Sequence, residues 1–419
     1  MKIQPGRRLA TIAALASISL LTAACGGGGF EEGGGASGAP TTEKGPVALK
    51  MLIASSGEAE TNAVKAATEA WAKKSGNTVE VAVAQDMQQQ LGQAFAGGTP
   101  PDIFYTDAGR FPDYAKAGSL YAYGDQVKEP DDFYAPLKAT FTYEDKFYCA
   151  PKDFSTIGLQ INKAAWAKAG LTDADIPTTW DQLHAVAKKL TTDKQAGLVI
   201  GDTRDRIGAF LVQAGGGITN EDGSKVIASS PENVTALDFV KSMLADGSAQ
   251  YPKQVDSGWG GEAFGTGKTA MTMEGNWIKG AMKKDYPTVG YQVAELPAGP
   301  KGKGTLLFTQ CWGIAAKSTH QAAAVDLVNS LTSVEQQLTF ADEFGVMPSR
   351  ESAKAQYEAK FPEDKAFIAG GEYGRGPVNK PGFDSVLADF DTGLQGLSTG
   401  DPTAILASLQ KNADAALKE

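Results

Sequence analysis

The chain has 419 residues, of which 42% are hydrophobic, and its formal net charge at pH 7 is -10. This length predicts two or three domains with real hydrophobic cores, and the composition is too polar for an integral membrane protein. The negative charge also argues against a nucleic-acid partner, because nucleic-acid binding normally needs a basic face.

The first residues have the pattern of an export signal. A basic start is followed by an apolar run over residues 9–21 and then by small residues up to Cys25. The run is too short to span a membrane, so residues 1–24 are interpreted as a cleavable signal peptide. The LTAAC ending resembles a bacterial lipobox, in which the cysteine is lipidated and becomes residue one. Ordinary cleavage with an unmodified Cys25 is the alternative.

The next segment, residues 25–46, is dominated by glycine and small polar residues. Such a composition cannot bury enough apolar surface to fold. We therefore expect a flexible tether that spans on the order of 25 Å for about 20 residues. Removal of the signal peptide takes away three positive charges and leaves a net charge near -10 - 3 = -13.

Two cysteines remain if Cys25 carries the lipid, namely Cys149 and Cys311. An exported protein lies in a compartment that permits disulfides. Composition and compartment alone leave a bridge and two separate buried thiols equally open.

The folded part begins with alternating strand and helix patterns. Residues 47–54 are largely apolar, residues 60–74 have apolar side chains at helical spacing, and residues 79–83 alternate. Apolar side chains of residues 87–95 share a helix face, and residues 102–105 have the pattern of a third short strand. This order of strand, helix, strand, helix and strand predicts an α/β fold with parallel strands, because such crossovers are right-handed.

Asp107 follows the third predicted strand. In an open α/β sheet, ligands lie beyond the carboxyl ends of the strands. The Asp107 carboxylate is therefore a candidate acceptor for ligand hydroxyl groups. A helix N-cap or a turn residue is the alternative, since aspartate is favoured at both.

The later part of the chain continues the mixture of strands and helices. Its most informative stretch is GKTAMTMEGNW, in which a turn leads into an apolar strand over residues 270–273. Glu274, Asn276 and Trp277 follow directly. A carboxylate, an amide and a large aromatic at the carboxyl end of a strand predict a binding surface.

No catalytic or cofactor motif accompanies this surface. Gly267-Lys268-Thr269 fails the spacing of a phosphate loop, because a glycine is required where the chain has Glu262. With two histidines and no CxxC pair there is no zinc ligand set, and no G-x-S-x-G elbow occurs. We therefore predict no cofactor, no metal site and no catalytic residue. A glycosidase needs only two carboxylates, however, and inspection does not exclude one.

Five segments of the mature chain together resemble the family 1 extracellular solute-binding proteins of ABC transporters, the sugar-binding lipoproteins of the maltose- and trehalose-binding type. These segments are AFAGGTPPDIFYTDAGRFPDYAKAGSL, YCAPKDFSTIGLQINKAAW, FGTGKTAMTMEGNW, CWGIAAKS and FGVMPSR. The resemblance extends from about residue 47 over the whole folded part.

The resemblance implies a two-lobed, periplasmic-binding-protein-like fold of type II, in which the lobes close on ligand like a clamshell. Lobe I would comprise residues 47–154 and 311–347, and lobe II residues 155–310 and 348–419.

The lobes would be joined by crossing hinge segments near residues 153–156, 309–312 and 347–350. This arrangement puts Cys149 and Cys311 next to neighbouring crossings, which favours a disulfide between them.

A carbohydrate ligand between the lobes is a further implication. Charged acceptors bind sugar hydroxyls strongly, aromatic faces cover the apolar side of the ring, and arginine supplies a fixed fork of donors. The candidate ligand-binding residues are Glu58, Asp107, Asp153, Trp259, Glu274, Trp277, Trp312, Arg350 and Arg375. Core packing is the alternative for the tryptophans, and ion pairing is the alternative for the arginines.

We therefore predict a monomeric, extracytoplasmic protein without enzymatic activity, lipid-anchored through Cys25 to the outer face of the cell membrane. It would bind an α-linked di- or oligosaccharide and deliver it to the permease subunits of an ABC transporter. A binding protein for a monosaccharide or a glycerol-phosphate compound is the alternative within this class. An exported carbohydrate-active hydrolase is the alternative from another class.

Overall fold

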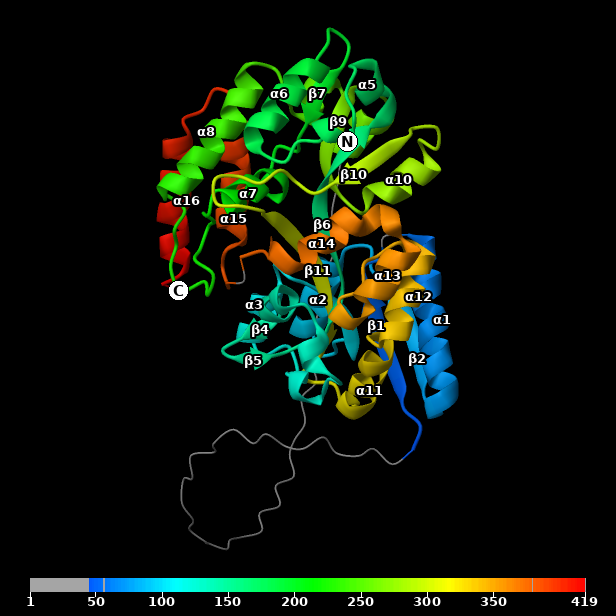
Figure 1. Cartoon of the computed structure of the whole chain (residues 1–419). Coiled ribbons are helices and arrows are strands. Elements are labelled where there is room, and N and C mark those ends of the chain that lie inside the picture. The colour runs from blue at the N-terminus through cyan, green and yellow to red at the C-terminus, as the bar shows by residue number, and fades with distance from the viewer. Residues whose placement is uncertain (1–44, 56, 379, 419) are drawn as a thin grey trace, which may run out of the picture. The chain divides into compact units, whose positions relative to one another are not determined.

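Most strands of the computed structural model form one mixed sheet, shown in Figure 1. The structure describes residues 45–55, 57–378 and 380–418. The predicted signal peptide, Cys25 and all but the last two residues of the predicted tether lie outside the described residues. All of these described residues belong to one compact unit.

Within the described residues, ten strands follow the order β2-β1-β3-β11-β6-β9-β7-β8, with β10 paired to β6 and β12 paired to β11. Their bounds are β1 (Ala48–Ile53), β2 (Thr78–Val83), β3 (Ile103–Asp107), β6 (Pro151–Asn162), β7 (Ala196–Val199), β8 (Ala249–Gln250), β9 (Thr269–Gly275), β10 (Tyr291–Ala294), β11 (Thr305–Ile314) and β12 (Gly374–Arg375). A separate hairpin is formed by β4 (Thr142–Tyr143) and β5 (Lys146–Phe147).

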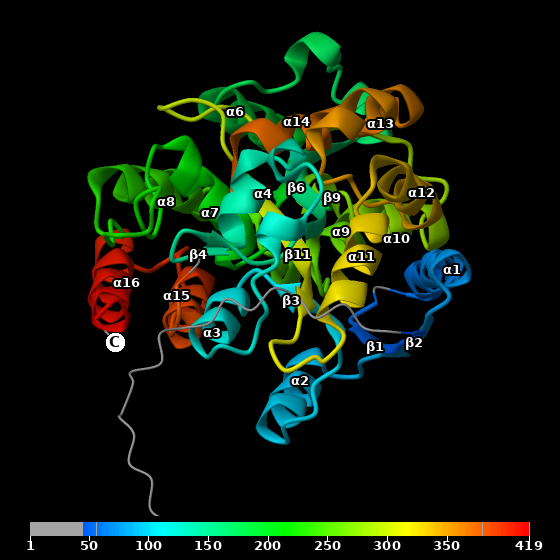
Figure 2. The ribbon, with the colours of Figure 1, turned by 90° about the horizontal axis from the view of Figure 1, so that it is seen from below.

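The helices cover the sheet on both faces (Figures 1 and 2). They are α1 (Glu58–Ser75), α2 (Met87–Ala96), α3 (Phe111–Lys116), α4 (Ala135–Thr140), α5 (Lys163–Lys168), α6 (Trp180–Leu190), α7 (Arg204–Gln213), α8 (Pro231–Ala245), α9 (Gly260–Gly265), α10 (Ile278–Lys284), α11 (Gln321–Leu331), α12 (Val334–Phe344), α13 (Lys354–Lys360), α14 (Lys365–Tyr373), α15 (Asp384–Gln395) and α16 (Pro402–Ala416).

The first α/β unit has the predicted arrangement. Strand β1 pairs in parallel with β2 on one side and with β3 on the other. Helices α1 and α2 connect these strands, as the helical spacing of their apolar residues predicts. A second parallel set is formed by β9, β7 and β8.

Two long antiparallel strands, β6 and β11, join these parallel sets. Strand β11 pairs with β3 and with β6, and β6 pairs in turn with β9. In Figure 1 they run between the lower and the upper groups of elements. Each of them therefore belongs to both parts of the sheet.

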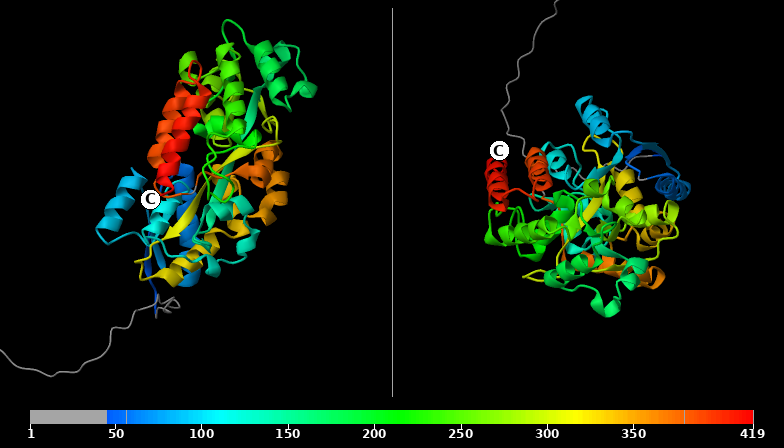
Figure 3. Two further views of the ribbon diagram at one scale, coloured as in Figure 1. Left: turned by 90° about the vertical axis from the view of Figure 1, so that its left-hand side faces the viewer. Right: turned by 90° about the horizontal axis from the view of Figure 1, so that it is seen from above.

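The apolar side chains form two large, separate clusters. The first core draws its buried members from residues 49–150 and 311–340. The second core draws its buried members from residues 157–296 and 383–413, and includes the adjacent C-terminal helices α15 and α16 seen in Figure 3. A smaller cluster around Phe154, Leu307 and Met347 lies where the chain passes between the cores.

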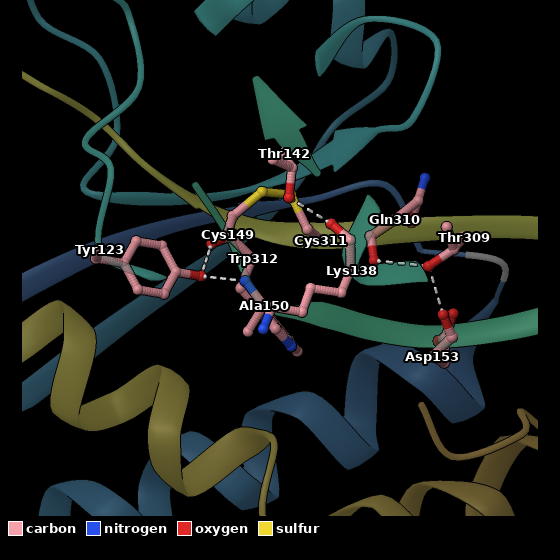
Figure 4. The surroundings of a disulfide bond; sticks show 10 residues. All are labelled: Tyr123, Lys138, Thr142, Cys149, Ala150, Asp153, Thr309, Gln310, Cys311 and Trp312. Carbon is pink, nitrogen blue, oxygen red and sulfur yellow. Dashed lines mark hydrogen bonds between the residues drawn. A yellow bond between two sulfur atoms is a disulfide. The ribbon is translucent and has the colours of Figure 1, made fainter. Parts of the chain in front are cut away.

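The disulfide between Cys149 and Cys311 ties the beginning of β6 to β11 (Figure 4). Both cysteines are buried, and their Cα atoms are 5.7 Å apart. Beside them, the Tyr123 hydroxyl donates to the Trp312 carbonyl at 2.5 Å and accepts from the Ala150 amide at 2.9 Å. The pairing that the resemblance implied is thus present in the structure.

Candidate functional site

A large cavity lies beside the segments of β6 and β11 that run between the two cores. Its volume is about 1980 Å³, which exceeds the roughly 300–1,000 Å³ of ordinary small-molecule pockets. The wall includes loops that follow β3, the start of α7, a glycine-rich loop at residues 215–223 and residues 372–381. Both cores therefore contribute side chains to it.

Three polar side chains form a row across the wall of this cavity. On β11, Gln310 is opposite Asp107 of β3 on one side and opposite Asp153 of β6 on the other. The Gln310 amide donates a hydrogen bond of 2.6 Å to the Asp107 carboxylate. Because directly opposite residues share a face of the sheet, we refer to Asp107, Gln310 and Asp153 as the polar row.

Strand alternation explains why these residues reach the cavity. In β11, Leu306, Phe308 and Gln310 are partly exposed and the residues between them are buried. In β6, Asp153 and Ser155 are partly exposed in the same alternating way. Successive side chains point to opposite faces of a strand. The partly exposed set therefore faces the cavity, with the Phe308–Ser155 pair next to the polar row.

Trp277 does not line the cavity itself but lies beside the wall, in contact with the lining residue Phe308. Its ring centroid is 5.2 Å from that of Phe308, and the rings are perpendicular. The side chain is 37% exposed, and its indole lies over Gly275, where a Cβ atom would come within 2.2 Å of the ring. An ordered, partly exposed indole supplies a flat apolar surface beside the hydrogen-bonding groups of the polar row.

Glu274 holds this indole in place. Its carboxylate accepts hydrogen bonds from the Trp277 indole N–H at 3.0 Å and from Arg206 Nη2 at 2.5 Å. Arg206 also lies over the indole, 5.0 Å from the ring centroid. Glu274 is only 1% exposed, which contradicts its predicted role as an acceptor of ligand hydroxyls. Instead, its carboxylate orients the Trp277 indole through their hydrogen bond.

Asp153 belongs to a mostly buried charged group at one end of the polar row. Lys152 forms ion pairs with Asp153 and with Glu60, and the latter also accepts from the Tyr105 hydroxyl at 2.9 Å. Burial raises the pKa of the Asp153 carboxyl, and the nearby Lys152 ammonium lowers it without cancelling the effect. Burial lowers the pKa of Lys152, but the neighbouring Asp153, Tyr105 and Glu60 outweigh it and raise that pKa overall.

Arg375 lines the cavity from β12, which pairs with the start of β11. Its guanidinium donates to the carbonyl oxygens of Gly216 and Thr219, at 3.0 Å for the first. Gly217 has a φ of 152°, and a Cβ atom there would lie 2.5 Å from Arg375 Nη1. Arg375 therefore fixes the glycine-rich loop of the wall, and burial lowers its pKa.

Two predicted ligand-binding residues lie in the interior. Trp312 is fully buried and makes an edge contact with Tyr105, because β11 is covered on both faces beyond Gln310. Arg350 is 3% exposed and donates to the carbonyl oxygens of Lys128 at 2.8 Å and of Glu129 at 3.0 Å. The predictions for Trp312 and Arg350 are wrong, since both side chains stabilise the first core.

Two further candidates lie elsewhere in the structure. Trp259 packs against the small apolar cluster of Phe264, Ile278 and Met282 and is not part of the cavity wall. Glu58 lies at the start of α1 and borders a separate hollow of about 480 Å³. The cavity therefore unites Asp107, Asp153 and Arg375, with Trp277 beside its wall.

Sequence reasoning missed Gln310, Phe308, Ser155 and Arg206. The first three were predictable in principle, because they occupy alternate positions of the strands that contain the crossings. Arg206 had no such signal, since it meets Glu274 across 68 residues of sequence.

These features define a class of protein: an α/β protein with two cores, crossing strands between them and a large polar cavity beside those strands. Residues 54–338, more than half of the chain, match the family described as bacterial extracellular solute-binding protein. The chain belongs to this family. Membership indicates a location outside the cytoplasm and a role in binding.

Similar proteins are found at the levels of sequence and fold. The diacetylchitobiose binding protein DasA of Streptomyces coelicolor is 25% identical over 68% of this chain and 69% of its own length. The cyclic α-maltosyl-1,6-maltose binding protein of Arthrobacter globiformis aligns with a TM-score of 0.80 and 21% identity, over 89% of this chain and all of the other.

The GacH receptor of Streptomyces glaucescens, whose structures include an acarbose complex, aligns with a TM-score of 0.76 and 22% identity, over 90% of this chain and all of the other. The structural matches confirm the fold as that of the maltose-binding-protein-like, type II periplasmic-binding proteins. Among the described residues, no helix combines the length and apolar character needed to cross a bilayer.

Proposed function

We propose that this protein is the substrate-binding component of an ABC transporter, that it binds an oligosaccharide in the cavity, and that it delivers this sugar to membrane permease subunits. The observation that carries the proposal is the polar row together with Trp277. Hydroxyl groups of a sugar would bind the acceptors of the row, and its apolar ring face would lie on the indole.

The size of the cavity favours an oligosaccharide over a monosaccharide. A volume of about 1980 Å³ leaves most of the space unfilled by one sugar ring. The relative DasA and the two structural matches above are also described as binding di- or oligosaccharides or related molecules.

Closure of two lobes on the ligand is part of the proposal. The two cores would act as the lobes, and β6 and β11 as the hinge. Ligand that contacts residues of both cores stabilises the closed form, because the open form offers it fewer contacts. A lipid anchor on Cys25 and a monomeric state complete the proposal.

A thermal-shift screen against maltose, maltotriose, cellotriose and N,N′-diacetylchitobiose tests this function. We expect at least one sugar to raise the unfolding temperature in a concentration-dependent manner. No shift with any of these sugars would contradict the proposal. Incubation of each sugar with the protein, followed by product analysis, separates it from a hydrolase, which would release cleavage products.

A further inference from the structure

Carboxylates outnumber cations in the wall of the cavity. Among the described residues that line it, ten are aspartate or glutamate and five are lysine or arginine. Three of the ten carboxylates, Asp153, Glu372 and Asp384, pair with cations outside the wall, and one of the five cations, Arg204, pairs with a carboxylate outside it. The remaining seven carboxylates and four cations still give the cavity a negative potential.

Three of the five wall cations are bound to groups of the protein itself. Lys138 pairs with Asp131 at 2.6 Å, and Arg204 pairs with Asp391. Arg375 donates to two carbonyl oxygens of the glycine-rich loop. An anionic ligand would have to displace these partners to gain a strong hydrogen bond from them.

A fourth wall cation, Lys380, lies next to Gly223. The neighbouring residue of that loop is Asp222, whose carboxylate attracts the Lys380 ammonium. Its charge is thus partly balanced by the wall. The fifth wall cation, Lys116, is not without a partner either.

Helices α7 and α15 begin at the cavity wall, and acidic side chains of the protein lie at both of their N-termini. At the start of α7, the backbone N–H of Arg204 donates to Asp391 at 2.7 Å, and Asp205 lies in the first turn. At the start of α15, Asp384 lies in the first turn and pairs with Arg110. Helix N-termini are the usual sites for phosphate and carboxylate ligands, and the acidic groups at these two disfavour an anion there.

Asp107 differs from these groups, because its carboxylate has an uncharged partner. It is exposed on the cavity wall and accepts from the Gln310 amide. Among the described residues, Asp107 forms no ion pair with a lysine or arginine. Its negative charge therefore acts on whatever occupies the space beside the polar row.

We propose that the cavity selects sugars without phosphate or carboxylate groups, and accepts neutral and amine-bearing sugars. This inference rests on the proposed function, and it makes a glycerol-phosphate ligand unfavourable. Repulsion from Asp107 and the shortage of unoccupied donors act together against an anion.

Isothermal titration of the full protein with matched sugars tests this selectivity. The probes are maltose and maltose 6′-phosphate, N,N′,N″-triacetylchitotriose and its amine-bearing counterpart chitotriose, and trigalacturonic acid as a second anionic sugar. We expect a neutral or amine-bearing sugar to bind, and each anionic probe to bind at least about tenfold more weakly than the tightest of these.

Two variants separate the charge effect from loss of folding. Asp107→Asn should narrow the affinity gap between the anionic and neutral probes, as should 0.5 M salt through screening. Asp193→Asn, in an exposed turn outside the wall, should leave the gap unchanged.

The possible outcomes are distinct. An anionic sugar that binds as tightly as the tightest neutral one overturns the selectivity but leaves the proposed function standing. An unchanged gap in Asp107→Asn overturns the part assigned to Asp107. A folded protein that binds none of the five probes and none of the sugars of the thermal-shift panel overturns both proposals.

Discussion

Asp107 and Gln310 lie opposite each other on neighbouring antiparallel strands, and the Gln310 amide donates to the Asp107 carboxylate at 2.6 Å. The amide fixes one carboxylate oxygen and leaves the rest of the group open to the cavity. Gln310 is also opposite Asp153. Its side chain therefore lies between the carboxylates of β3 and β6.

Replacement of Gln310 by leucine should weaken sugar binding with little loss of stability. The variant removes the group that orients Asp107 and one hydrogen-bonding partner for ligand, a loss of about 1 kcal/mol or roughly fivefold in affinity. Isothermal titration measures it, with Gln88→Leu on the exposed face of α2 as the matched control. Equal affinities for Gln310→Leu and the wild type would remove Gln310 from the site.

Glu274→Gln should disturb Trp277 without touching the ligand. The variant replaces the side chain that accepts from the Arg206 guanidinium and the indole N–H, so the free energy of unfolding should fall by about 1–3 kcal/mol.

The tryptophan signal distinguishes a positioning role from a purely structural one. We expect a change in near-ultraviolet circular dichroism and weaker sugar binding in Glu274→Gln, with Glu262→Gln as a control carboxylate outside the wall. Lower stability with an unchanged tryptophan signal and unchanged affinity would contradict the positioning role.

Loss of the disulfide should destabilise the protein strongly. The bridge closes a loop over a sequence separation of 162 residues, and the chain-entropy relation gives about 5 kcal/mol for a loop of this length. Thermal unfolding of Cys149→Ser, Cys311→Ser and the double variant should give similar, lowered midpoints. Reductant should lower the midpoint of the wild type alone, and an unaffected wild type would contradict the prediction.

The free energy of unfolding should depend on pH through the titration of the buried Asp153 carboxyl. Burial raises its pKa, and Lys152 lowers it by less. The folded protein then binds this proton more tightly than the unfolded chain, whose aspartate pKa is about 3.9. The free energy of unfolding therefore falls as the pH rises from the unfolded pKa through the folded one.

Urea unfolding of the wild type and Asp153→Asn across this window measures the effect. The wild type should lose stability relative to the variant as the pH rises above about 4. A relative gain of the wild type over the same range would show that the folded pKa is lowered instead.

A pair of contacts links α3 of the first core to the start of α15 in the second. Arg110 forms an ion pair with Asp384, and the Gly382 N–H donates to Asp113 at 3.2 Å. Because the Arg110 and Asp384 side chains are 33% and 42% exposed, the pair should contribute less than about 1 kcal/mol.

Arg110→Gln should therefore change sugar affinity by no more than about fivefold and leave the unfolding temperature nearly constant. The charge-exchanged variant Arg110→Asp/Asp384→Arg should restore the wild-type affinity. A larger effect, or a failure of the exchange to restore it, would show that Arg110 acts through another contact.

Much of the fold could be predicted from local patterns. The parallel order of β1, β2 and β3 follows from apolar strands separated by helices of the right length. The placement of Asp107 and Trp277 at the ends of β3 and β9 follows from the same patterns, since a strand end is fixed by the change from apolar to polar residues.

The wrong predictions have a common physical cause. Trp312 shares its strand with Gln310, but coverage of β11 by distant elements decides which of them is buried. Arg350 binds carbonyl oxygens more than 200 residues earlier in the chain. Neither contact leaves a trace in local spacing, so residue type alone made both look like ligand-binding groups.

The most direct test of the proposed site is isothermal titration of the oligosaccharide panel into the wild type, Trp277→Ala and Trp259→Phe. We predict that the wild type binds a sugar at one site per chain, that Trp277→Ala weakens this binding at least about tenfold, and that Trp259→Phe, outside the cavity wall, leaves it intact. Equal binding by the wild type and a folded Trp277→Ala would contradict the placement of the sugar. No binding of any sugar by the wild type would contradict the function.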